Sequence, residues 1–242
     1  MNIIRIHSRS LLCAVLLFLC AGSTLLAQVP ESPNKLNGAG ERDGQWTLLF
    51  DKEMQPVTDA DSAVYYSVLT FDGGKITGTA RTYFRSGAKM SEVNYINGIK
   101  EGLTVGWFAN GKKEFETPYK AGLTNGTETI WHPSGQKRSE VTYKDGRENG
   151  LQTEWYPGGA KKSEIPYKNG QIDGTAVRWY ESGAKQTEIP HKAGKVEGTR
   201  VDWHANGKKK SEIRYKNGKR TGDAINWDES GRLLPENKAT RP

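Results

Sequence analysis

Glycine recurs in this chain at a fixed interval of 24 residues, as Gly87 and Gly111 illustrate (111 − 87 = 24). Three such glycine tracks run in parallel from residue 78 to residue 231 without a change of register. Self-similarity at a fixed period is typical of repeat architectures, in which one supersecondary unit buries its apolar surface only by stacking on its neighbours. The sequence therefore restricts this region to a tandem array.

Residues between the glycines alternate with a period of two, which predicts strands. Thr175, Val177 and Trp179 share one face of a predicted strand, whereas Arg178 and Tyr180 share the other. Glycine with Asn, Asp or Ser bounds each strand, and this composition is typical of tight hairpin turns. We therefore predict an all-β fold: an elongated, single-layer antiparallel β-meander of tandem 24-residue hairpin repeats.

Three prolines fall inside the second predicted strand of their units, at Pro118, Pro166 and Pro190. Proline cannot donate to a β-ladder, so within sheets it is confined to strand ends, edges and bulges. We predict that this position is a β-bulge, or that its nitrogen points away from the neighbouring strand.

The repeated pattern G-x-x-x-x-W-[YFH]-x-[SN]-G-x-K-x-x-E-x-x-Y-x-x-G resembles the bacterial variant of the MORN repeat, over roughly residues 76–231. The resemblance implies an elongated β-meander that acts as a protein-interaction scaffold. Lipid-headgroup binding has been proposed for some relatives, and many bacterial members are labelled as antitoxins of toxin–antitoxin pairs. The family shares no catalytic residues, so the resemblance implies a protein that is not an enzyme.

Residues 1–27 have the composition of a signal peptide. A basic start precedes the apolar stretch Leu11–Leu19, and Ala27 is the last residue before the expected cleavage. The apolar stretch is shorter than the about 20 residues that a membrane span needs. Cys20 lacks a small residue before it, which argues against a lipoprotein anchor. We therefore expect an exported protein, periplasmic or secreted.

The remainder of the chain divides by composition. Residues 28–45 are rich in Pro, Asn, Gly and charge, and are predicted as a flexible lead-in. Residues 46–77 are predicted as a divergent N-terminal capping unit, 78–231 as the repeats, and 232–242 as a C-terminal cap and disordered tail. Caps are expected because an exposed sheet edge pairs with other chains.

Two tracks of side chains mark the two faces of the predicted sheet. We interpret the first as a packed, structural ladder, formed by Trp107, Trp131, Trp155, Trp179, Trp203 and Trp227. The second track varies between copies, which favours an interaction face. Its members are Phe84, Phe108, His132, Tyr156, Tyr180 and His204.

The charged residues indicate a solvated surface and no catalytic centre. The net charge is +7, but Lys and Glu are interleaved, as expected for cross-strand ion pairs. The repeated glutamates are about 10 Å apart by strand spacing, which is too far for a carboxylate dyad. His132 and His204 lie three units apart and cannot share a metal. No phosphate loop, zinc spacing or nucleophile motif is present, so no catalytic, cofactor or metal residue is predicted.

These observations favour an exported, non-enzymatic scaffold for protein–protein interaction in the cell envelope. One alternative is an antitoxin or immunity-type protein that neutralises a toxin. Another is binding of anionic lipid or cell-wall glycan through the Lys and aromatic rows. Export and the lack of a recognisable binding module argue against nucleic acid as a partner.

Overall fold

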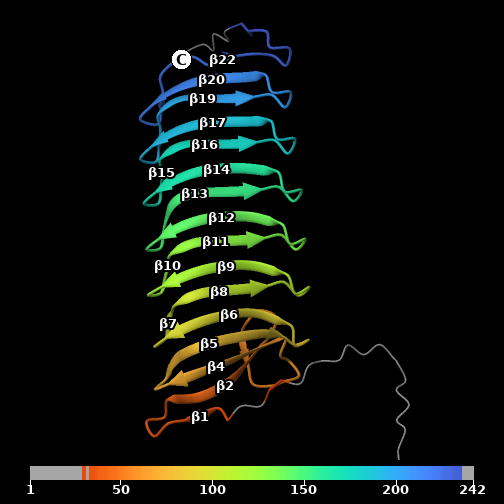
Figure 1. The fold of residues 1–242 in the computed structure, drawn as a ribbon, viewed down its shortest axis with the longest axis vertical. Helices are drawn as coiled ribbons and strands as arrows, with labels where there is room; N and C mark the ends of the chain where they lie inside the picture. Colours follow the sequence, from red (N-terminus) through yellow and green to blue (C-terminus); the bar gives the residue numbers. More distant parts are fainter. Residues whose placement is uncertain (1–28, 31–32, 236–242) are drawn as a thin grey trace, which may run out of the picture.

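The computed structural model of the protein describes residues 29–30 and 33–235. Within that part, 22 strands form one open antiparallel sheet in meander order. Figure 1 shows the strands stacked along the long axis, from the N-terminal end (orange) to the C-terminal end (blue). The predicted fold, a single-layer β-meander, is confirmed.

Each unit of the array contains a short strand, a six-residue strand and a returning eight-residue strand. The eight-residue strands are β6 (Lys89–Ile96), β9 (Lys113–Lys120), β12 (Lys137–Lys144), β14 (Lys161–Lys168), β17 (Lys185–Lys192) and β20 (Lys209–Lys216). The six-residue strands are β8 (Gly102–Trp107), β11 (Gly126–Trp131), β16 (Gly174–Trp179) and β19 (Gly198–Trp203). The two-residue strands are β7 (Ile99–Lys100), β10 (Leu123–Thr124), β15 (Gln171–Ile172), β18 (Lys195–Val196) and β21 (Lys219–Arg220). In two units the first two pieces are continuous, as β5 (Lys75–Phe84) and β13 (Arg147–Trp155).

The glycine track that includes Gly98 forms the turns between units. Asn97 and Gly98 have φ angles of 51° and 81°, and two positive φ angles are the signature of a type I′ hairpin turn. Similar pairs of angles recur at each such turn up to Asn217 and Gly218. These turns line one lateral edge of the sheet. We call it the short-strand edge, because β7, β10 and β15 begin there (Figure 1).

The glycine track that includes Gly111 closes the loops at the opposite edge. Phe108 N donates to Lys112 O at 2.9 Å, Gly111 N donates to Phe108 O at 2.9 Å, and Gly111 has a φ of 78°. This is the three-residue hairpin loop with a glycine in the left-handed region. The loop is accompanied by a register shift between Gly106 and Trp107.

The third glycine track occupies a bulge in the first strand of each unit. Gly126 has a φ of 120°. Thr124 pairs with Tyr119 of β9 and Thr129 pairs with Glu116, so the strand advances five residues while β9 advances three. Pro118 lies opposite this bulge, and its carbonyl accepts a hydrogen bond from Asn125 N at 2.9 Å. Nitrogen and carbonyl of one residue point the same way in an antiparallel ladder, so the proline nitrogen also faces the bulge. The proline itself is therefore not in a bulge, since Pro118 pairs in regular register with Leu103; its nitrogen points to a stretch of the facing strand where no ladder partner is needed, which is the second predicted alternative.

The N-terminal unit consists of β1 (Lys35–Leu36), β2 (Arg42–Phe50), β3 (Pro56–Val57) and β4 (Tyr65–Asp72). Among the described residues, the buried hydrophobic side chains all lie here: Ala63, Tyr66, Leu69 and Phe71. The array beyond is a single layer, so its hydrogen-bond ladders and cross-strand pairs hold it together.

The sheet begins earlier than the sequence predicted. β2 starts at Arg42, four residues before the predicted cap at 46, and Lys35–Leu36 pair with it. Part of the predicted flexible lead-in, 28–45, is therefore hydrogen-bonded into the sheet. The cause is local: the side-chain oxygen of Asn37 accepts from the backbone of Ala39 and Glu41, both at 2.9 Å, and closes the turn.

The C-terminal edge is covered by a short, irregular segment. β22 (Ile225–Asn226) pairs with β20, and Trp227 bridges to Leu233. The covering segment thus starts before the predicted cap at 232. The predicted signal peptide, 1–27, and the end of the predicted tail, 236–242, lie outside the described residues.

Candidate interaction surfaces

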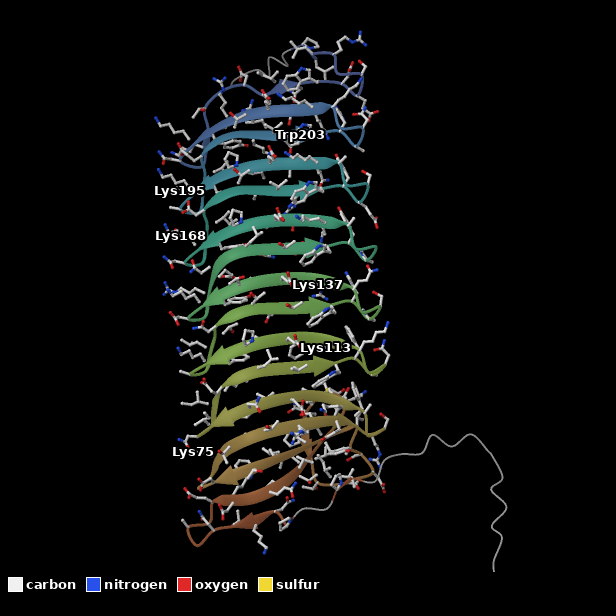
Figure 2. The ribbon with its side chains drawn as sticks, in the orientation of Figure 1. Lys75, Lys113, Lys137, Lys168, Lys195 and Trp203 are labelled. Carbon is white, nitrogen blue, oxygen red and sulfur yellow. The ribbon has the colours of Figure 1, made fainter. Side chains whose placement is uncertain are left out.

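One face of the sheet, which we call the tryptophan face, carries a ladder of Lys, Trp and Glu. Lys161 Nζ lies 5.4 Å from the ring centroid of Trp179 in the next unit, and it also forms an ion pair with Glu164. Five further units repeat the arrangement, with Nζ–centroid distances of 4.9–5.8 Å. The further Lys–Trp pairs are Lys89–Trp107, Lys113–Trp131, Lys137–Trp155, Lys185–Trp203 and Lys209–Trp227. Figure 2 labels Lys113, Lys137 and Trp203 on the ribbon.

This ladder ties consecutive units together. An ammonium group lies over each of these rings, which makes a cation–π contact and leaves the ring less open to a stacked ligand. The glutamates act as counter-ions, but the ladder pairs join a Lys and a Glu three residues apart on one strand and do not cross strands as predicted. Burial alone raises the pKa of Glu92, but hydrogen bonds from Arg81 (2.7 Å) and Lys89 outweigh it and hold that pKa below its usual value.

The opposite face, which we call the tyrosine face, carries the predicted interaction residues. All six are half-buried: Phe84, Phe108, His132, Tyr156, Tyr180 and His204. The Tyr180 hydroxyl donates to Trp203 O at 2.8 Å, and Tyr156 and His204 make the same contact with the tryptophan one unit further on, at 2.9 Å. His132 Nε2 is buried and makes no hydrogen bond within the described part of the chain.

These hydrogen bonds give the row a part in joining the units, which the sequence analysis missed. The sequence did contain an indication of such bonds, because four of the six residues in this row carry a polar atom at the far end of the ring. The structure places the row on the predicted face. Its use as an interaction face stays a prediction.

Tyr180→Phe is expected to lower the free energy of unfolding by about 0.5–1.5 kcal/mol, because the Trp203 carbonyl loses its donor. Chemical denaturation followed by circular dichroism measures this. Tyr215→Phe is the matched control, since the described structure shows no hydrogen bond from that half-buried hydroxyl. Equal losses in the two variants would contradict a stabilising role for the Tyr180 bond.

Two hollows lie on the tyrosine face, two repeat units apart. The larger, of about 460 Å³, is lined by Arg178, Tyr180, Gln186, Thr187, Arg200, Asp202, Trp203 and Lys210. The smaller, of about 290 Å³, is lined by His132, Arg138, Ser139, Glu154, Trp155, Tyr156, Pro157 and Lys162. Two cations of the larger hollow are Arg178 and Arg200. The equivalent positions two repeat units earlier are Ile130 and Gln152, which carry no charge.

The carboxylate in the larger hollow is already neutralised. Asp202 accepts from Arg200 Nη2 at 2.9 Å and from Ser211 Oγ at 2.7 Å. Burial alone raises the pKa of Asp202, but these bonds hold it below its usual value. The Thr187 hydroxyl, which faces Asp202 across the strands, also lowers the pKa of this carboxylate.

The short-strand edge changes character along the sheet. Two of its earlier turns carry exposed apolar side chains: Ile96 is 59% exposed, Ile99 51% and Leu123 51%, and Leu103 of β8 is 43% exposed. Basic side chains begin on the Leu123 turn itself and continue along the later turns, as Lys120, Lys144, Arg147, Lys168, Lys192, Lys195, Lys216 and Lys219. None of these eight forms a salt bridge among the described residues. Figure 2 labels Lys75, Lys168 and Lys195 along this edge.

The described residues contain no group of His, Cys, Asp and Glu that could hold a metal ion. No helix in that part has the length and hydrophobicity to cross a membrane. His191, which replaces a repeat tyrosine, is half-buried and its Nδ1 lies 2.8 Å from Ile189 O.

Fold and surfaces together define a tandem β-repeat protein whose surfaces are open to partners. Five segments match a family model described as MORN repeat variant: residues 76–97, 100–121, 124–145, 148–169 and 196–217. The chain therefore contains tandem MORN repeats, which are generally scaffolds that bind proteins or membranes. Residues 172–193 fold into the same kind of unit, with β16 and β17. A search of curated proteins found no match.

Proposed function

We propose that this chain is an exported, non-enzymatic repeat scaffold that binds another protein in the cell envelope. The observation that carries the proposal is the apolar part of the short-strand edge, defined by Ile96, Ile99, Leu103 and Leu123. Ile99 and Leu123 lie on consecutive turns: a Cβ on Gly122 would be 3.2 Å from Ile99 Cγ2. Exposed apolar side chains that gather on one surface mark interaction sites.

The partner surface that fits this edge is apolar with acidic flanks. Lys120 pairs with Leu123 across the second apolar turn, and the basic turns continue beyond it. Acidic side chains at this edge are partly engaged: Glu101 accepts from Ala121 N at 2.7 Å and Glu197 from Asn217 N at 2.6 Å. Charge complementarity of this kind steers association and sets specificity. A toxin neutralised by this chain would be one such partner.

The signal-peptide composition of residues 1–27 supports export, and the scaffold character of MORN repeats supports a non-enzymatic role. The lysine-rich turns favour a second candidate function, binding to anionic lipid or cell-wall glycan. That binding would depend on charge and weaken with salt, whereas apolar docking would persist.

The test is affinity capture from cell-envelope extract, with the chain expressed with its own leader and purified by a C-terminal tag. Baits are the natural chain, Ile99→Ser/Leu123→Ser, and the control Leu234→Ser, which changes a leucine that is 44% exposed at the far end. We expect an envelope protein that survives high salt with the natural and control baits and is lost with the double variant. Direct titration of that protein should then show binding at least about tenfold weaker for the double variant.

Capture that is equal for all three baits would contradict docking at the apolar edge. If the baits retain only lipid or glycan, and salt releases it, the result would favour the second candidate function, binding to anionic lipid or cell-wall glycan.

A further inference from the structure

The larger hollow on the tyrosine face holds two cations that have no counter-ion. Arg178 and Lys210 are exposed, and neither side chain makes a hydrogen bond or ion pair in the part of the chain that the structure describes. In the smaller hollow Lys162, the equivalent of Lys210, pairs with Glu154 at 3.3 Å. Arg138, also exposed and without an ion pair among the described residues, is the one unpaired cation of the smaller hollow, so the larger hollow has one more.

A third cation in the larger hollow is held in place. Arg200 directs Nε and Nη2 at Asp202, at 2.9–3.2 Å, which leaves Nη1 without a partner within the described residues. Ser211 fixes the same carboxylate from the next strand. A guanidinium anchored on one side offers preorganised donors on the other.

A buried hydroxyl completes the set of donors. Thr187 is 8% exposed, and its Oγ1 makes no hydrogen bond within the described residues. Its cross-strand neighbours are Arg178 and Asp202. Arg178 offers only donors, whereas Ser163, the equivalent of Thr187 one unit earlier, donates to Glu154 at 3.2 Å. Asp202 faces the Thr187 hydroxyl on one side, and an anion beside Arg178 would offer it a second acceptor on the other.

We propose that this hollow binds a small ligand through an oxyanion, a carboxylate or a phosphate, held by Arg178, Arg200 and Lys210. Guanidinium groups match the geometry of both oxyanions, and Lys210 supplies a point charge. The volume of about 460 Å³ lies within the range of small-molecule sites. The hollow lies towards the tryptophan end of β16 and β19, away from the short-strand edge. The two proposed sites can therefore fail independently.

The test is isothermal titration calorimetry, in which the full chain is titrated with citrate, a polycarboxylate, and separately with pyrophosphate, at constant ionic strength. We expect saturable one-to-one binding of at least one of them. Arg178→Gln and Lys210→Gln should each weaken it about tenfold or more, because each removes one charged donor. The tighter of the two probes identifies the oxyanion.

The matched control is Lys162→Gln, which removes the equivalent lysine of the smaller hollow and should leave binding unchanged. Thermal melts monitored by circular dichroism verify that each variant folds. Three outcomes would each overturn the proposal: neither probe binds, Arg178→Gln and Lys210→Gln leave the Kd unchanged, or Lys162→Gln weakens binding as much as they do. Each would mean that the cations of this hollow act only as ordinary surface charge.

Discussion

Gly174→Ala is expected to lower the free energy of unfolding by about 2–5 kcal/mol, among the largest effects of any single substitution in the array. Two costs add. Gly174 has a φ of 127°, in a region that side chains rarely occupy, and strain of this kind costs about 1–3 kcal/mol. The new Cβ would also lie 2.8 Å from Cγ of Pro166, and overpacking costs about 1–3 kcal/mol more. Urea denaturation followed by tryptophan fluorescence measures the sum.

Two further variants separate these costs. Gly102→Ala changes the equivalent glycine of another unit, where φ is 76° and the nearest atom, Asn94 Nδ2, is 3.9 Å from the added Cβ. It should therefore show the conformational cost alone, about 1–2 kcal/mol. Combining Pro166→Ala with Gly174→Ala should recover part of the loss, because the obstructing ring is gone. Identical losses for Gly102→Ala and Gly174→Ala, with no recovery in the double variant, would rule out the steric contribution.

The fold was predictable because each glycine track imposes a local backbone conformation. Gly98 and Gly111 lie in turns whose dipeptide composition already indicates a hairpin. Pro118 indicated an interruption of the ladder, since proline cannot donate to it, but the bulge itself lies on the facing strand at Gly126, which was not predicted. The start of β2 at Arg42 was missed because the Asn37 turn that secures β1 lies in a segment whose composition resembles a flexible linker.

Contacts between units were the part that sequence could not supply. The bond from Tyr180 to the Trp203 carbonyl spans 23 residues and depends on how far the ring leans along the sheet, which strand alternation does not determine. Alternation placed Tyr180 on the correct face but could not reveal that its hydroxyl is engaged. The hollow beside Arg178 likewise depends on the side-chain volumes of four adjacent strands, β16, β17, β19 and β20.

The apolar edge was accessible to a closer comparison of the repeats. Ile96 occupies a position where later units have lysine, and Ile99 and Leu123 precede Arg147 and Lys195 in the same column. A repeat position that changes from basic to apolar at a turn carries no folding requirement, because the turn forms with either. Such departures from the repeat favour function over structure.

Trp179→Ala is expected to lower the free energy of unfolding by about 2–4 kcal/mol. Truncating a fully buried aromatic residue costs about 3–5 kcal/mol, and Trp179 is half-buried in a single layer, which reduces the loss. The substitution also removes the cation–π contact with Lys161, worth about 0.5–1 kcal/mol at an exposed site. Lys161→Met, which keeps the aliphatic stem, should lose about that smaller amount, plus the modest contribution of its ion pair with Glu164.

Trp179→Tyr is the informative comparison, because the first unit already has Tyr83 at this position, stacked on Tyr66 at a centroid distance of 5.0 Å. An aromatic ring there should therefore retain much of the packing, and this variant should lose clearly less than Trp179→Ala. Thermal and chemical denaturation of all three variants measure the order. If Trp179→Ala were no more harmful than Tyr180→Phe, the ladder on the tryptophan face would not be what holds the units together, and the hydrogen bonds of the tyrosine face would carry that role.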